Sequence, residues 1–245
     1  MIQLDYLNQV RRICDFYEKD LSQINKAAEI CAEAIKNKNL LYFFKVGHDN
    51  ESDFLNRAGG LASAKRFSFN FGWSADVPEC RTEGLGKDKP GMNLEAVKLA
   101  LKASNIRKGD IMFVGSVSGK TNNYVDLALA CKELGITTIG FTSLEYTGQV
   151  EATHPSGKKL LDVVDIVIDN GAPFGDACVD CVGLDHKVLP ISGVSMLVAG
   201  WLIMGKAAEI LGEQGMAPTM FESVNKPNGF EKYDNYVKTF NERGF

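Results

Sequence analysis

Apolar positions change their spacing along the chain. Through residues 1–37 they recur every three or four positions, as at Leu4, Leu7, Val10 and Ile13, which predicts one or two amphipathic helices. After that they gather into short continuous runs such as LLYFFKV at 40–46, a length typical of buried strands. The same criteria predict further helices at 54–64, 93–104, 123–134 and 194–211, and further strands at 66–71, 110–115, 137–142 and 163–169.

The alternation of helices and strands predicts the fold class. Strands that are apolar throughout and separated by helices indicate a parallel sheet covered on both faces. We therefore expect an α/β fold, a three-layer doubly wound parallel sheet. Ligands bind such sheets beyond the carboxyl ends of the strands, which directs attention to the loops at 47–52, 116–122 and 143–157.

The rest of the chain has a weaker pattern. A stretch rich in glycine, proline and charge fills 72–91, and a loop at 218–229 precedes a short polar tail. The simplest division is a helical extension at 1–37, one α/β domain at 38–230 and a C-terminal tail at 231–245.

Composition excludes several classes of protein. The 245 residues are 45% hydrophobic and 24% charged with a net charge of -4, as in an ordinary globular domain. Because a nucleic-acid binder needs a basic face, no nucleic-acid partner is expected. The apolar run at 194–204 is short for a membrane span, and residues 1–10 lack a signal-peptide pattern. With six scattered cysteines interpreted as reduced thiols, we expect a cytoplasmic protein without membrane contact.

The segment GSVSGKTNN at 115–123 carries the strongest chemical signal. It lies between a predicted strand and a predicted helix, and it brings the hydroxyl residues Ser116, Ser118 and Thr121, with Gly119, to a helix start. The unpaired amides and the helix dipole at such a start favour a phosphate. Plain helix capping accounts for one hydroxyl, whereas an anion site accounts for three.

A nucleotide-binding interpretation of the same loop is weaker. The GKT at 119–121 matches the end of a Walker A sequence, which requires four residues between its two glycines. Only three residues separate Gly115 from Gly119. A loop this short does not wrap a phosphate in the usual way, so nucleotide phosphotransfer is kept only as a lesser alternative.

Residues 116–121, SVSGKT, resemble the Ser-x-Ser-Gly-x-Thr/Asn phosphate-binding signature of the sugar isomerase (SIS) domain family. RAGGL at 57–61, HPSGK at 154–158 and GDA at 175–177 narrow the resemblance to a group of stand-alone SIS proteins, over roughly 40–225.

The resemblance implies a phosphosugar-binding domain with a five-stranded parallel sheet, commonly dimeric. By motif position, Ser116, Ser118 and Thr121 would hold the phosphate and Gly119 would let the backbone approach. SIS domains serve isomerases, amidotransferases, lyases and sugar-phosphate sensors, so the fold does not decide the reaction.

The first loop departs from the pattern of that group. The group has Gly-His-Ser-His, then an acidic residue four positions before the RAGGL arginine. Here Gly47, His48 and Asp53 match, the serine and second histidine are replaced at 49–50, and Ser52 offers a substitute hydroxyl. A carboxylate with an imidazole suits proton transfer through an enediol. The alternative is a solvated acidic turn.

His154 in HPSGK and Glu222 in MFESVN, a stretch that resembles the ending of the same group, are further catalytic candidates. His154 could instead tie down a turn, and Glu222 could belong to a capped loop. Cys178 and Cys181 form a single CxxC without the further ligands that zinc needs. We expect no metal and no other cofactor.

The expected ligand is thus a phosphorylated sugar or amino sugar, and the expected activity is aldose–ketose isomerisation. A non-catalytic phosphosugar sensor is the alternative. A homo-oligomer, dimer or tetramer, is expected, with the apolar N-terminal helix between subunits. The candidate catalytic residues are His48, Asp53, His154 and Glu222, and the candidate phosphate-binding residues are Ser116, Ser118, Gly119, Thr121, Gly47 and Ser52.

Overall fold

A parallel sheet forms the middle layer of the protein. The computed structural model describes residues 1–48, 50–71, 78–81 and 92–245. Within these ranges, five parallel strands pair in the order β2-β1-β3-β4-β5. The doubly wound α/β fold predicted from the sequence is confirmed. The strands are β1 (Leu41–Val46), β2 (Ala64–Arg66), β3 (Ile111–Gly115), β4 (Thr137–Thr142) and β5 (Ile166–Asp169).

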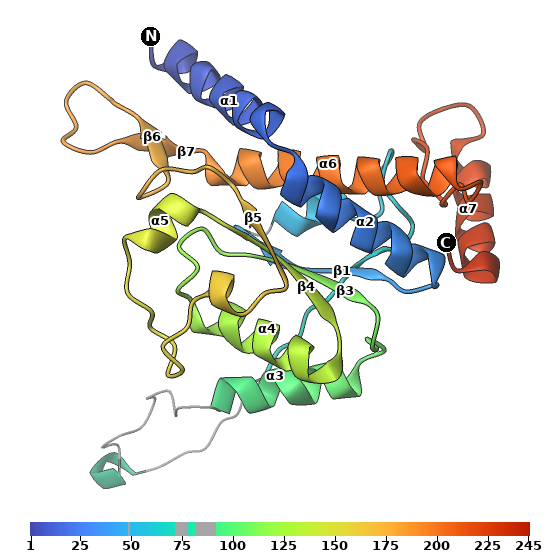
Figure 1. Ribbon diagram of the computed structural model, residues 1–245, viewed down its shortest axis with the longest axis horizontal. Helices are drawn as coiled ribbons and strands as arrows, with labels where there is room; N and C mark the ends of the chain where they lie inside the picture. Colours follow the sequence, from blue (N-terminus) through green and yellow to red (C-terminus); the bar gives the residue numbers. More distant parts are fainter. Residues whose placement is uncertain (49, 72–77, 82–91) are drawn as a thin grey trace.

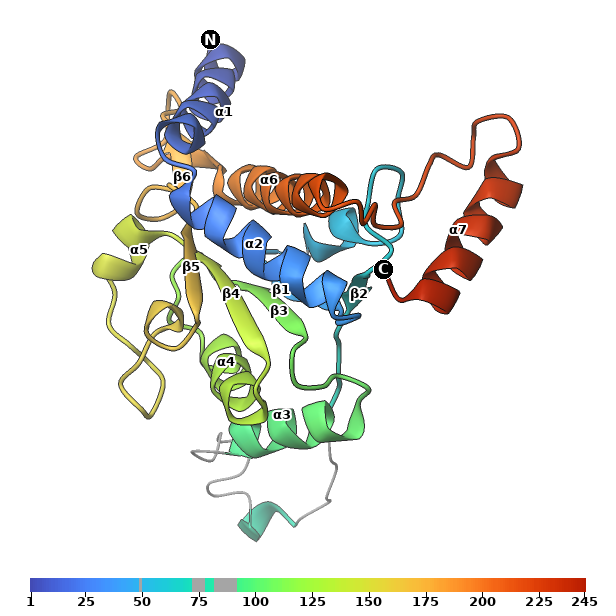
Figure 2. The same cartoon turned by 45° about the vertical axis from the view of Figure 1, so that its right-hand side comes forward.

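Helices cover both faces of this sheet (Figure 1 and Figure 2). One face carries α2 (Ser22–Lys36), α6 (Ser192–Glu213) and the end of α1 (Ile2–Lys19), whose start projects beyond the sheet. The other carries α3 (Met92–Ala103) and α4 (Asn122–Leu134). The remaining elements are α5 (Leu144–Gly148), α7 (Gly229–Arg243), the 3-10 helices η1 (Asn50–Phe54), η2 (Glu79–Arg81) and η3 (Leu160–Asp162), and the hairpin strands β6 (Ala177–Val179) and β7 (Val188–Pro190).

Alternate residues of each strand enter two separate cores. Phe43 of β1 and Phe113 of β3 face α2 and α6, and their rings stack with centroids 4.5 Å apart. Tyr42 and Met112 face α3 and α4. The strands are apolar on both sides because both faces of the sheet are covered.

The apolar character of α6 comes from its place in the first of these cores. By length and composition alone α6 would be able to cross a membrane. In the fold it packs beside α2 and fully buries Met196, Ala199 and Ile203. Phe54 packs against Gly200, where a Cβ would lie 2.4 Å from the ring. The apolar face of α6 is therefore buried against α2 and η1.

The helix predicted at 54–64 is wrong. After η1 the chain turns, and the Gly59 N–H donates to Phe221 O at 2.8 Å while the Phe221 N–H donates to Gly60 O at 3.0 Å. These backbone groups pair with a segment some 160 residues away along the chain, which short-range periodicity does not reveal. As a result β2 begins at Ala64, earlier than the predicted 66–71.

Other boundaries also move. The N-terminal segment folds as two helices, and η3 takes the residues just before the predicted strand at 163–169, so β5 begins at Ile166. The expected polar tail folds as α7, whose Tyr233, Val237 and Phe240 share the three-and-four spacing of a helix face. Most of the loop predicted at 72–91 lies outside the described residues. The division of the chain at 38 and 230 stays a prediction.

Two glycines of α6 should respond in opposite ways to alanine. Gly200→Ala is expected to lower the free energy of unfolding by about 1–3 kcal/mol, because the new Cβ collides with the buried ring of Phe54. Gly205→Ala, at an exposed position where a Cβ meets nothing within 4 Å, is expected to raise it by up to about 1 kcal/mol. Urea denaturation of both variants checks this. Equal effects would contradict the packing of Phe54 on α6.

Candidate functional site

The carboxyl ends of β1 and β3 meet where the direction of strand succession reverses. The chain places β2 on one side of β1 and β3 to β5 on the other. The Gly47 N–H donates to Gly115 O at 3.2 Å, and a Cβ on Gly115 would lie 2.9 Å from Gly47 N. Glycine at 115 thus lets the two loops come together, at the point where doubly wound sheets bind ligands.

Backbone hydrogen bonds fix the loop between β3 and α4. The Ser116 N–H donates to Phe141 O at 2.9 Å, and the Gly119 N–H donates to Ser116 O at 3.1 Å. Gly119 has a φ of 64°, and a Cβ there would lie 3.0 Å from the hydroxyls of Thr142 and Thr147. The protein therefore sets the shape of this loop without a ligand.

The same loop presents a group of unpaired hydrogen-bond donors. Thr121 is the N-cap residue of α4, yet its side chain makes no capping hydrogen bond. Among the described residues, the hydroxyls of Ser116, Ser118 and Thr121 have no hydrogen-bond partner, and neither do the backbone N–H groups of 118 and 120–123. Such a set at a helix start suits a phosphate dianion. The simple capping alternative does not describe this loop.

The loop after β1 begins with a β-bulge. The pairing of β1 with β3 shifts between Phe44 and Val46, and Lys45 has a φ of 38°. Bulges redirect side chains and occur beside active sites; here the Lys45 side chain is exposed. His48 follows in a turn, where its ring is exposed and has no hydrogen bond to any described residue.

Two carboxylates of the next turn have different environments. Asp53 forms an ion pair with Arg57, and both side chains are about half exposed, at 46% and 49%. Glu51 is only 4% exposed and accepts a hydrogen bond from Arg66 Nη1 at 3.0 Å. Ser52, between them, is exposed. The sequence pattern does not mark Glu51 or Arg66 as site residues, because their pairing depends on β2 lying beside β1.

His154 is buried against α4. The Ser156 N–H donates to His154 Nδ1 at 3.1 Å, so Nε2 carries the proton, which it donates to Asp126 Oδ1 at 3.0 Å. The two side chains of this pair are 8% and 6% exposed. Asn93 donates to the other oxygen of Asp126. His154 thus joins its turn to α4, and its assignment to catalysis stays a prediction.

Glu222 lies at the opposite end of the sheet. Leu61 pairs with Met220, and Leu61 precedes the start of β2; Figure 1 shows α7 at the end of the sheet away from α5. Tyr236 OH donates to Glu222 at 2.7 Å, and this bond, with the charge of Lys232, lowers the pKa of Glu222. Within one chain, Glu222 is not brought together with His48 or with the loop at 116–121.

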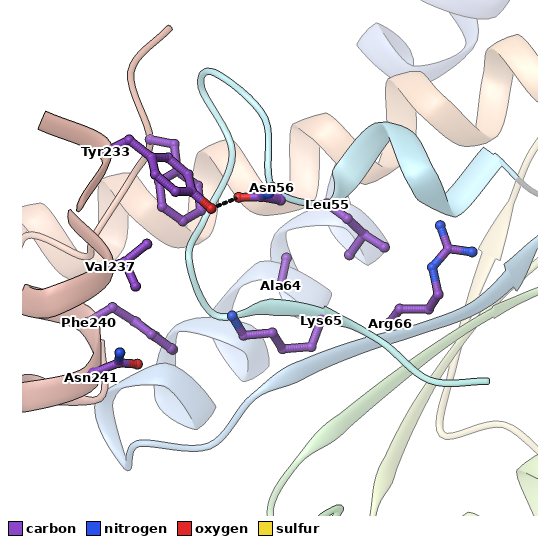
Figure 3. A pocket seen from close by; sticks show the side chains of 10 residues that line it. Leu55, Asn56, Ala64, Lys65, Arg66, Tyr233, Val237, Phe240 and Asn241 are labelled. Carbon is purple, nitrogen blue, oxygen red and sulfur yellow. Dashed lines mark hydrogen bonds between the residues drawn. The ribbon is translucent and has the colours of Figure 1, made fainter. Parts of the chain in front are cut away.

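The described residues enclose a hollow of about 370 Å³ between the outer edge of β2 and α7, and Arg66, the partner of Glu51, is one of the residues that line it (Figure 3). Tyr233 OH donates to Asn56 at 2.8 Å across it. The Lys65 ammonium points toward the Phe240 ring, 4.9 Å from its centroid, and burial lowers the pKa of Lys65. Aromatic and cationic side chains thus line this hollow without belonging to the predicted site.

The CxxC cysteines lie on the β6–β7 hairpin. The Cys178 thiol is buried and donates to Leu189 O at 3.1 Å, and Cys181 lies in the turn that follows β6. Over the part of the chain that the structure describes, no group of three or more His, Cys, Asp or Glu side chains is arranged to hold a metal.

Comparison with known proteins identifies a family for this chain, in keeping with its fold and with the loop at the start of α4. The family model described as SIS domain matches residues 5–143, more than half of the chain, and the chain belongs to this family. It is 34% identical over 242 residues to the UPF0309 protein OB3413 of Oceanobacillus iheyensis, covering 95% of this chain and 96% of that protein. It is 33% identical over 229 residues to the UPF0309 protein ABC0887 of Shouchella clausii, covering 90% and 87%.

Among solved structures, the chain is similar to phosphoheptose isomerase GmhA from Neisseria gonorrhoeae. The TM-score is 0.50 at 15% identity, and the match covers 84% of this chain and 95% of that one. At this identity the likeness is one of fold.

Substituting His154 tests its structural role. His154→Ala is expected to lower the free energy of unfolding by about 1–3 kcal/mol, because it leaves the buried Asp126 carboxylate with one partner fewer. His186→Ala, whose ring is 68% exposed, should change it by less than about 0.5 kcal/mol. Urea denaturation compares the two. A His154→Ala protein as stable as the wild type would return His154 to the free acid–base candidates.

Proposed function

We propose that this protein binds a phosphorylated sugar or amino sugar and acts as an aldose–ketose isomerase. The observation that carries the proposal is the set of unpaired donors at the start of α4, three hydroxyls with consecutive backbone N–H groups. Donors of this kind bind phosphate without any nearby excess of basic residues. Membership of the SIS domain family supports the same ligand class.

In the proposed complex, the phosphate lies against 116–121. Ser116, Ser118 and Thr121 donate their hydroxyls, and Gly119 leaves room for the phosphate to approach the backbone. Gly47, whose N–H donates to Gly115 O at the base of that loop, completes the phosphate end of the site. Ser52, the remaining hydroxyl candidate, follows farther along the adjoining loop, toward the sugar. The sugar then extends from the start of α4 across the end of β1.

For isomerisation, a base removes a proton from the carbon beside the sugar carbonyl, which gives an enediol, and the proton returns to the neighbouring carbon. His48 is exposed on the loop beside the proposed phosphate site, so we assign it the proton shuttle. Asp53, His154 and Glu222 remain candidates for the other group. Each of the three is engaged by another side chain of the same chain.

A non-catalytic phosphosugar sensor is the second proposal, and the first loop favours it. Asn50 stands where the resembling group has a histidine, and its Nδ2 lies 3.4 Å from Gly193 O at the start of α6. An amide held in this way does not transfer protons. Nucleotide phosphotransfer is the weakest alternative, because the loop from Gly115 to Gly119 is one residue short of a Walker A loop.

We further propose a cytoplasmic homo-oligomer, dimer or tetramer, that requires no cofactor and has no nucleic-acid or membrane partner. The projecting part of α1 exposes Leu4 and Leu7, at 49% and 47%. On the outer face of α6, Leu202 is 38% exposed. Exposed leucines on neighbouring helices support burial between subunits.

The phosphate site is tested by the double variant Ser118→Ala with Thr121→Ala. It should bind sugar phosphates and inorganic phosphate at least about tenfold more weakly, since hydrogen bonds to a charged group are lost. Its free energy of unfolding should be unchanged, because neither hydroxyl has a partner among the described residues. Thr239→Ala on the remote helix α7 serves as the control. Titration calorimetry with fructose 6-phosphate, glucosamine 6-phosphate and sedoheptulose 7-phosphate measures the affinities.

Unchanged affinity in the double variant would move the phosphate site elsewhere. The same titrations include ATP with magnesium. Binding of that nucleotide, with no binding of any of the sugar phosphates, would reject the phosphosugar proposal in favour of phosphotransfer.

Catalysis is tested by proton exchange. In deuterated water the wild-type protein should introduce deuterium beside the carbonyl of a bound sugar phosphate, and His48→Ala should slow this by about 100-fold. His186→Ala should exchange at the wild-type rate. Nuclear magnetic resonance follows the label. Exchange that persists in His48→Ala excludes that residue, and binding without exchange in the wild type supports the sensor.

A further inference from the structure

One oxygen of Glu51 is buried without a partner. Among the described residues, three buried side-chain polar atoms have no hydrogen bond: Glu51 Oε2, Ser63 Oγ and Asn170 Nδ2. Of these three, Glu51 Oε2 alone belongs to an ionisable group. Its other oxygen accepts from Arg66 Nη1 at 3.0 Å, and the side chain is 4% exposed.

A buried carboxylate oxygen without a partner needs a hydrogen-bond donor. Burying a charged oxygen without a hydrogen bond is costly, and nearly all buried polar groups in proteins are paired. The neighbouring carboxylate of Asp53 is half exposed and has its arginine. Glu51 therefore has a buried acceptor oxygen without a partner on the loop beside the proposed site, whereas Asp53 has no such buried oxygen.

The strand order gives the approximate separation between Arg66, the partner of Glu51, and the phosphate loop. Arg66 ends β2, which pairs with β1 on one side, while the loop at 116–121 follows β3, which pairs with β1 on the other. Strands two positions apart are separated by about 10 Å. A hexose or heptose phosphate in its open form spans a comparable distance. A sugar whose phosphate lies at the start of α4 is therefore long enough to reach the Glu51–Arg66 pair.

We propose that Glu51 is the residue that recognises the sugar, by accepting a hydrogen bond at Oε2 from a hydroxyl or ammonium group remote from the phosphate. Arg66 holds the carboxylate in place through Oε1. This inference rests on the proposed phosphosugar function. It predicts that the protein selects ligands with a hydrogen-bond donor about two strand spacings from the phosphate. Sugar phosphates have such a donor, and inorganic phosphate does not.

The test compares two ligands in one variant. Glu51→Gln keeps one side-chain oxygen, which can still accept from Arg66. It removes the charge and replaces the second oxygen with an NH2 group, which cannot accept a hydrogen bond. Its affinity for the sugar phosphate that the wild type binds best, among the three named above, should fall about 10- to 100-fold, while its affinity for inorganic phosphate stays within about twofold. Glu51→Asp, which withdraws the oxygen but keeps the charge, should show the same selective loss. Glu33→Gln, on the exposed side of α2, is the matched control.

Equal losses for sugar phosphate and inorganic phosphate would mean that Glu51 only shapes the loop, and would overturn the inference. Unchanged affinity for both ligands would overturn it as well. The double variant at Ser118 and Thr121 separates this failure from failure of the proposed function, because it should lose both ligands. If the wild type binds none of the sugar phosphates, the function and the inference fall together.

Discussion

The close approach of β1 and β3 determines most of what this protein presents at its surface. In the core the rings of Phe43 and Phe113 stack. At the ends of the same strands the two backbones lie so close that a side chain on residue 115 would collide with the backbone of Gly47. Both following loops therefore emerge at one place. The loop after β3 must then turn at once into α4, which is why its three hydroxyls and the N–H groups of 118 and 120–123 have no partner among the described residues.

Local sequence patterns predict those parts of the structure whose interactions are local. Strands β1, β3, β4 and β5 and the helix start at Thr121 follow from short-range hydrophobic runs and turn residues, whereas β2 shares only Arg66 with the strand predicted at 66–71. The segment at 54–64 does not follow from such patterns, because Gly59 and Gly60 pair with Phe221. The last helix, α7, is not predicted from the sequence either, because most of its residues are polar. Its aromatic face is recognised only from the packing of Tyr233 on Phe221.

The candidate site divides in the same way. The loop at 116–121 could be found from its hydroxyls and glycine, since the residues are consecutive. The environments of His154, Glu222 and Glu51 could not, because each depends on a partner in another element: Asp126 for His154, Tyr236 for Glu222 and Arg66 for Glu51. Spacing shows which side chains share a loop, but burial and pairing decide which of them keep an unused oxygen or nitrogen.

The charged residues of β2 have a consequence for self-association. β2 is the outermost strand on its side of the main sheet, and an open edge strand is a template on which another chain can add its own strand. This one is three residues long and carries Lys65 and Arg66, with α7 standing beside it across the hollow. Short length, positive charge and a flanking helix are the means by which natural sheets avoid edge-to-edge aggregation. The cations that line the hollow thereby also oppose the pairing of this edge strand with sheets of neighbouring molecules.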